Sequence, residues 1–80
     1  MKTTLQEMTV GETATVSGYT TGAAVYRGKL LAMGLTRGTK ITVERIAPMG
    51  DPVEIMVRGF ALSLRKDEAS ALMVERGKQS

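Results

Sequence analysis

The 80-residue sequence contains no cysteine, no histidine and no tryptophan. The lack of cysteine excludes a disulfide framework, a thiolate metal site and a cysteine nucleophile. Without histidine, the chain also lacks the usual general base and the commonest ligand of transition metals. Ser17, Ser63 and Ser70 therefore have no histidine partner for nucleophilic catalysis. We expect no enzyme, no cofactor and no specific metal site, since Asp51 with Glu54 would offer oxygen ligands only.

Long apolar runs are also absent. The longest contain about four residues, as in Leu30–Met33, whereas roughly 20 are needed to cross a bilayer. The first residues, MKTTLQEMTVGE, contain one lysine but no apolar segment of the kind found in a secretory signal. We therefore expect a cytoplasmic protein that does not insert directly into the membrane.

What is present is the composition of one small globular domain. The chain is 42% hydrophobic and 24% charged, with a formal net charge of +3. A chain of this size buries only roughly 60–65% of its unfolded surface, so its core is thin. The basic residues are spread along the sequence, and pairs such as Arg27/Lys29 and Arg65/Lys66 fall short of a polybasic stripe.

The stretch from Ala47 to Arg65 has the clearest periodicity. Apolar residues alternate with other residues in Val53–Arg58 and again in Phe60–Arg65, with Gly59 between the two runs. Because side chains alternate between the two faces of a strand, this pattern predicts two half-buried strands separated by a kink. A glycine at such a kink is typical of a bulge or a barrel corner.

A helix is predicted over Ala23–Met33, where Ala23, Tyr26, Leu30 and Met33 form one apolar stripe. Gly34 lies where a left-handed C-terminal cap would be. Gly28, inside the helix, costs about 1 kcal/mol relative to alanine, and we interpret it as a sign of close packing against a strand.

The other predicted elements complete a small barrel. They are strands over Thr13–Val16 and Thr39–Ile46, a loop over Ser17–Gly22, a helical turn over Lys66–Leu72 and a last strand at Met73 and Val74. Closing the sheet would remove edges that could pair with other chains. We therefore predict a mostly β fold with a short helix: a single SH3-like β-barrel of about five strands with an inserted helix. The domain would span residues 1–75, followed by a flexible tail over residues 76–80.

Without a catalytic set, the surface is the place to look for function. Met49, between Pro48 and Gly50 at a turn tip, is hard to bury locally, and its flexible side chain suits contact with a partner. Leu31 lies off the apolar stripe of the helix. A plain loop and a core position remain the alternatives for Met49 and Leu31, respectively. The candidate partner-binding residues are Arg27, Leu31, Pro48, Met49, Gly50 and Asp51.

Three stretches resemble the FeoA family of bacterial ferrous iron uptake: KLLAMGLTRGTKITV, APMGDPVEIMVRG and FALSLRKDEASAL. The lead-in LQEMTVGETATVSGY is also similar, so the resemblance covers about residues 5 to 75. It implies an SH3-like barrel and protein–protein contact with the cytoplasmic side of FeoB, a membrane permease with a GTP-hydrolysing domain. The segment YTTGAAVYRG departs from the family pattern, because Arg27 stands alone where a pair of arginines is common.

The leading hypothesis is thus a non-enzymatic accessory or regulatory protein of ferrous iron uptake. The alternative is a small basic nucleic-acid-binding β-barrel, but one Phe and two Tyr offer few stacking platforms, and we expect no nucleic-acid partner. A third hypothesis, a detached domain of an iron-dependent repressor, would share the fold but require a DNA-binding helix pair and a metal site. Self-association of the barrel is left open.

Overall fold

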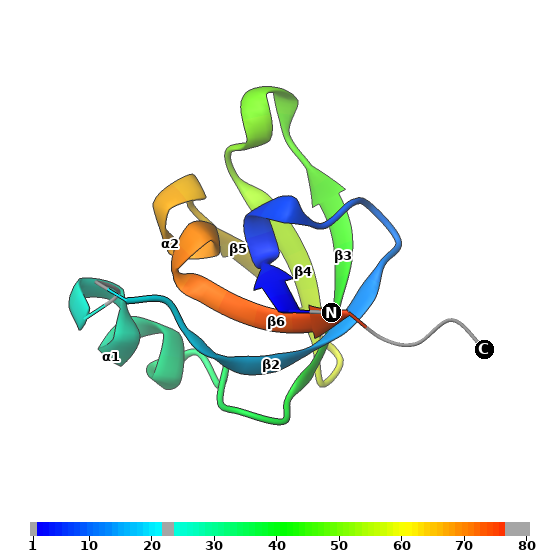
Figure 1. Cartoon of the computed structure of the whole chain (residues 1–80). Coiled ribbons are helices and arrows are strands. Elements are labelled where there is room, and N and C mark those ends of the chain that lie inside the picture. Colours follow the sequence, from blue (N-terminus) through cyan, green and yellow to red (C-terminus); the bar gives the residue numbers. More distant parts are fainter. Residues whose placement is uncertain (1, 22–23, 77–80) are drawn as a thin grey trace.

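The computed structural model describes residues 2–21 and 24–76, and within them the chain folds into one curled antiparallel sheet with short helices (Figure 1). The strands are β1 (Lys2–Thr4), β2 (Thr13–Tyr19), β3 (Lys40–Ile46), β4 (Val53–Val57), β5 (Phe60–Leu64) and β6 (Leu72–Arg76). The helices are α1 (Ala24–Ala32) and α2 (Lys66–Ala71), with 3₁₀ turns η1 (Leu5–Glu7) and η2 (Pro48–Gly50). The predicted mostly β architecture is confirmed, with six strands in the sheet where about five were predicted.

The strand order is β1-β6-β2-β3-β4-β5, so the first and last strands of the chain lie side by side. Every neighbouring pair is antiparallel. Register shifts occur in β2 between Val16 and Gly18 and in β3 between Val43 and Arg45. Such bulges increase the local bend and twist of a strand, which helps the sheet to curl around its core.

The core follows from the alternation of the strand sequences. Residues of β2 and β4 alternate between buried and half-buried, as the period of two predicts. Leu5 of η1 and Met8, which directly follows η1, are also buried in the core. The short strand β1 was not predicted, because three residues are too few to show a period. It pairs with β6 from Lys2 opposite Glu75 to Thr4 opposite Met73.

The predicted kink at Gly59 is instead a complete hairpin turn. Val57 pairs with Phe60, so Arg58 and Gly59 alone connect β4 to β5, and their φ angles are 51° and 83°. Positive φ at both central residues is characteristic of a type I′ turn, which matches the twist of the flanking strands. The prediction of a bulge or barrel corner here was wrong, since an Arg-Gly pair is a weaker hairpin signal than Asn-Gly.

Helix α1 is attached to the sheet by one fully buried residue, Leu30, with Tyr26 and Met33 packed more loosely against the core. Gly34 has φ 88°, and Leu35 N donates to Leu30 O at 3.0 Å, so the predicted left-handed cap is confirmed. A Cβ added at Gly28 would meet no atom within 4 Å, so the predicted close packing at Gly28 was wrong. Ala23, predicted as the first residue of this helix, lies outside the described residues.

Several predicted boundaries differ from the structure: α1 ends at Ala32 rather than Met33, α2 ends at Ala71 rather than Leu72, and β6 begins at Leu72 rather than Met73. The loop predicted over Ser17–Gly22 begins later, because β2 continues through Tyr19 and pairs there with Leu72 of β6. Arg76, assigned to the tail, is the last residue of β6, and its Nη2 donates to Glu7 O at 2.7 Å. Residues 77–80 of the predicted tail lie outside the described residues.

Candidate partner-binding surfaces

The turn η2 forms a projection beyond the ends of β3 and β4, which we call the tip (Pro48–Gly50; the green loop at the top of Figure 1). Met49 at its centre is 93% exposed and has φ 69°, a value that side-chain-bearing residues rarely adopt. Gly50 N donates to Ala47 O at 2.9 Å, and Ala47 N donates to Pro52 O at 3.0 Å. The backbone therefore closes the turn and leaves the Met49 side chain in solvent.

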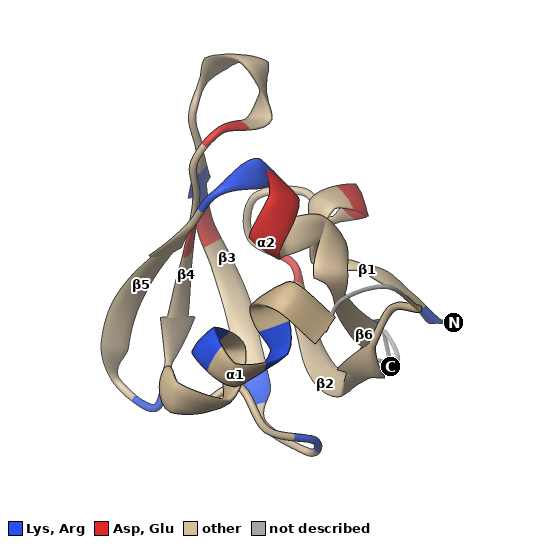
Figure 2. Ribbon diagram, turned by 90° about the vertical axis from the view of Figure 1, so that its left-hand side faces the viewer, with Lys and Arg blue, Asp and Glu red and all other residues tan. Residues whose placement is uncertain are grey.

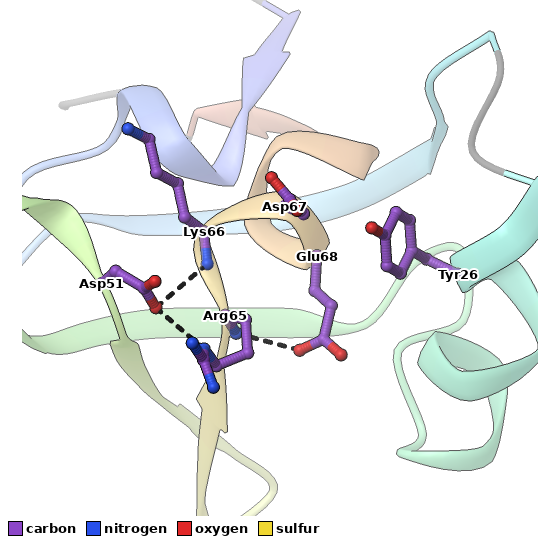
Figure 3. Close-up of a pocket in the computed structure, with 6 residues that line it drawn as sticks. All are labelled: Tyr26, Asp51, Arg65, Lys66, Asp67 and Glu68. Carbon is purple, nitrogen blue, oxygen red and sulfur yellow. Dashed lines mark hydrogen bonds and ion pairs between the residues drawn. The ribbon is translucent and has the colours of Figure 1, made fainter.

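Asp51 fastens the tip to the junction of β5 and α2. Its Oδ1 accepts hydrogen bonds from Arg65 Nε at 3.1 Å and from the backbone N of Lys66 at 3.3 Å (Figure 3). The Arg65 side chain is 74% exposed, so water weakens this ion pair. Asp51 therefore holds the tip in place, with its side chain 33% exposed.

A polar pocket of about 300 Å³ lies beside Asp51, between α1 and α2 (Figure 3). Its lining residues are Tyr26, Asp51, Arg65, Lys66, Asp67 and Glu68. Both signs of charge line it, and two of its three carboxylates already accept hydrogen bonds: Asp51 from Arg65 and Lys66, and Glu68 from Lys29 and Arg65. Within residues 2–21 and 24–76, no group of three or more acidic, histidine or cysteine side chains could hold a metal ion.

Glu68 is the one buried carboxylate of this region, and it joins the two helices. Its Oε1 accepts the backbone N–H of Arg65 at 2.9 Å, which caps the first turn of α2, and its Oε2 pairs with Lys29 Nζ of α1. The hydrogen bond from Lys29 lowers the pKa of Glu68, and the bond from the Arg65 backbone lowers it further, against the smaller effect of burial. The ionised carboxylate of Glu68 therefore stabilises the contact between α1 and α2.

The outer face of α1 carries the other two candidate residues. Arg27 places its guanidinium 5.6 Å from the centre of the Tyr19 ring, within the range of a cation–π contact. Tyr19 in turn donates its hydroxyl to Leu35 O at 2.7 Å. Leu31 is 42% exposed, whereas its neighbour Leu30 is fully buried. Arg27 and Leu31 are thus both accessible on the surface of α1.

The structure does not bring the six candidate residues into one site. Arg27 and Leu31 lie on α1, whereas Pro48, Met49 and Gly50 form the tip, and Figures 1 and 2 both place α1 and the tip at opposite ends of the molecule. The polar pocket lies between them, lined by Tyr26 of α1 and by Asp51. A single small contact could therefore involve the α1 residues or the tip, but not both.

Sequence reasoning missed an apolar groove at the start of β5. It encloses about 250 Å³ between the end of α1 and the β4–β5 hairpin, lined by Ala32, Met33, Gly34, Val57, Arg58, Phe60 and Leu62. The alternation Phe60, Leu62, Leu64 predicts one face for all three, yet Leu64 is buried, Leu62 is half-buried and Phe60 is 72% exposed. Burial along β5 therefore decreases towards the hairpin turn, and the Phe60 side chain remains on the surface.

No helix within the described ranges 2–21 and 24–76 has the length and apolar character required to span a bilayer.

Comparison with known sequences identifies the family. Residues 3–76 match the FeoA domain. A curated relative, the Fe(2+) transport protein A/Fe(2+) transporter FeoB fusion protein of Porphyromonas gingivalis, is 35% identical over 71 residues. That match covers 89% of this chain but only 8% of the fusion protein, so the chain corresponds to a small part of this relative.

Solved structures agree with this assignment. The FeoA-like protein from Clostridium acetobutylicum is 38% identical and superposes with a TM-score of 0.88, covering 99% of this chain and 91% of that one. FeoA of Stenotrophomonas maltophilia, described as a prokaryotic SH3 domain protein and solved with zinc, is 25% identical, with a TM-score of 0.73. That match covers 90% of this chain and 88% of the other, and it confirms the SH3-like fold. The chain therefore belongs to the FeoA domain family, whose members are non-enzymatic accessory proteins of ferrous iron transport.

Proposed function

We propose that this protein supports bacterial ferrous iron uptake by binding the cytoplasmic side of an FeoB-type permease. The observation that carries the proposal is the Porphyromonas gingivalis relative, whose name joins Fe(2+) transport protein A and FeoB in one polypeptide. Fusion gives two protein modules a high effective concentration, which favours a contact between them. In the present chain, residues 1–75 would act as one domain in the same contact on the cytoplasmic side.

The tip is the part of the candidate surface that we assign to this contact. Met49 offers a flexible apolar side chain that is 93% exposed, and Pro48 and Gly50 hold it on a rigid turn. A preformed turn loses little conformational entropy on binding, so most of the apolar burial is available as affinity. Arg27 and Leu31 form a second candidate area on α1, to be tested separately from the tip.

Co-purification of the full chain with FeoB tests this assignment. Met49→Asp should leave the fold intact, because the side chain lies in solvent, and should weaken co-purification by placing a charge in the contact. Val10→Asp is the matched control, since Val10 is a 59% exposed apolar residue in the turn before β2. Equal recovery of FeoB with wild type and Met49→Asp would exclude the tip as the FeoB-binding surface. Reduced recovery with Leu31→Asp but not with Met49→Asp would indicate that α1 makes the contact instead.

The same preparation discriminates the nucleic-acid alternative. Removing nucleic acid with nuclease before the pull-down should leave FeoB recovery unchanged if the contact is between proteins. Recovery that depends on nucleic acid, or salt-sensitive binding to random oligonucleotides with no binding to FeoB, would favour the alternative instead.

A further inference from the structure

The fold gathers basic residues that are scattered in the sequence. Residues 13–43 and 55–66 contain seven of the eleven basic residues and none of the eight acidic residues. In Figure 2, basic segments group at the end of the molecule formed by α1, the loop that follows it and the β4–β5 turn. We call this region the basic end; its exposed cations are Arg27, Arg37, Lys40 and Arg58, together with Lys29, whose ammonium group is already paired with Glu68.

Contacts with neighbouring elements hold the guanidinium groups of the basic end in place. Arg58 Nη2 donates to Thr39 Oγ1 at 3.3 Å, which ties the β4–β5 turn to the start of β3. The Arg37 guanidinium lies against Gly18 of β2, where a Cβ would meet its Nη2 at 3.5 Å. Arg27 lies over the ring of Tyr19. These three cations are therefore each held by a contact with a neighbouring element.

Exposed apolar side chains lie on the same end. Val25 is 82% exposed, Phe60 72% and Leu31 42%, and these are three of the five large apolar side chains that the described residues expose. Phe60 directly follows the Arg58–Gly59 turn and borders the apolar groove with Met33. Exposed apolar groups of this size surrounded by cations indicate an interaction site with an anionic partner that also accepts apolar groups.

We propose that the basic end binds the surface of an anionic phospholipid bilayer. Its ammonium and guanidinium groups would lie against lipid phosphates, and Phe60, Leu31 and Val25 would enter the headgroup region. The choice of a bilayer follows from charge complementarity together with the spread of the apolar groups over α1 and the hairpin, since an extended lipid surface offers both contacts at once. Binding is peripheral, with no segment crossing the membrane.

This orientation leaves the opposite end of the molecule free. The tip and Met49 would point away from the lipid, available to a protein on the same membrane. The proposal does not depend on the FeoB contact, because the lipid surface and the tip use different residues. A negative result for lipid binding would therefore not contradict the proposed FeoB contact, and a negative result for FeoB binding would not contradict lipid binding.

Sedimentation of the full chain with large vesicles tests the proposal. We expect binding to phosphatidylcholine vesicles that contain about one third phosphatidylglycerol, and at least about tenfold weaker binding to phosphatidylcholine alone. Raising the salt from about 0.05 to 0.5 M should release the protein, because screening shortens the range of the attraction. Soluble glycerol phosphate in excess should not compete, which distinguishes a lipid surface from a site for a free phosphate.

Matched variants locate the surface. Arg37→Glu should reduce anionic-vesicle binding several-fold, whereas Arg45→Glu, which alters a 75% exposed arginine of β3 outside the basic end, should reduce it much less. Phe60→Ser should weaken binding, and Met49→Ser should leave it unchanged. No sedimentation with anionic vesicles, or equal effects of the two members of each pair, would overturn the proposal. Oligonucleotide binding that is tighter than vesicle binding would overturn it as well.

Discussion

The carboxylate of Glu68 in α2 pairs with the ammonium group of Lys29 in α1, across 39 positions of sequence. Glu68 is 6% exposed in its side chain and Lys29 is 59% exposed, so one partner is buried and the other reaches it from solvent. The same carboxylate caps the first turn of α2 through the Arg65 backbone. One buried charge therefore fixes the helix that carries Arg27 and Leu31 to the rest of the domain.

Glu68 should make the stability of the domain sensitive to acid. Its pKa is lowered in the folded protein, first by the hydrogen bond from Lys29, so ionised Glu68 stabilises the fold above the unfolded-state pKa of about 4.3. That stabilisation should be lost as the pH falls below about 4.3 towards the lower pKa of the folded state. Glu68→Gln should lower the free energy of unfolding by about 1 kcal/mol near pH 7, with a smaller difference at lower pH.

Urea unfolding of both proteins at several pH values measures this effect. Glu44→Gln removes an exposed carboxylate of β3 and serves as a control, which should change stability by less than about 0.5 kcal/mol. A difference between wild type and Glu68→Gln that stays constant down to the lowest pH would contradict the assigned role.

Tyr19 should contribute to the stability of the domain through its hydroxyl group as well as through its ring. Tyr19→Phe keeps the contact with Arg27 but removes the 2.7 Å hydrogen bond to Leu35 O. We expect a loss of about 1 kcal/mol and a fall in Tm of roughly 4–8 °C, measured by thermal unfolding. Tyr26→Phe, which alters a hydroxyl at the polar pocket, is the control, and an equal loss in both variants would refute the specific role of Tyr19.

Adjacent leucines of α1 should differ widely in their contribution to stability. Leu30 is completely buried, so Leu30→Ala should cost about 3 kcal/mol by leaving a cavity between α1 and the sheet. Leu31 is 42% exposed, and Leu31→Ala should cost less than about 1 kcal/mol. Chemical denaturation of the two variants measures the contrast, and similar values would mean that α1 is rotated about its axis relative to this structure.

The left-handed backbone conformation of Met49 in the tip should lower the free energy of unfolding of the domain. Met49 has φ 69°, so Met49→Gly should relieve backbone strain and raise the free energy of unfolding by about 0.5 kcal/mol. Gly50→Ala, at φ 77° in open space, should lower it by about 1 kcal/mol through conformation alone. If denaturation shows Met49→Gly to be the less stable protein, the tip conformation is not strained as described.

The sequence allowed the strands to be predicted where their period was visible. Val53–Arg58 and Phe60–Arg65 alternate cleanly, and both strands begin at the predicted residue and end one residue earlier than predicted. The depth of burial along β5 was not predictable, because the exposure of Phe60 depends on where α1 ends relative to the hairpin. The grouping of Arg27, Arg37 and Arg58 likewise depends on tertiary structure, since the three residues lie on separate elements.

The candidate site was predicted in parts rather than as a whole. The exposure of Met49 and Leu31 follows from a turn sequence and from a residue that lies off the apolar stripe of a helix. The role of Asp51 in fastening the tip could not be foreseen, because Arg65 and Lys66 lie 14 and 15 positions away in sequence. Local patterns therefore indicated which residues are exposed, and only the fold shows which of them lie together.

Titration of purified FeoB, held in detergent or in a lipid nanodisc, with the full chain is the most direct measurement of the proposed contact. We predict saturable binding that Met49→Asp weakens by at least about tenfold while Val10→Asp leaves it unchanged. Absence of saturable binding, or equal affinities for wild type and Met49→Asp, would contradict the proposal that the tip binds FeoB.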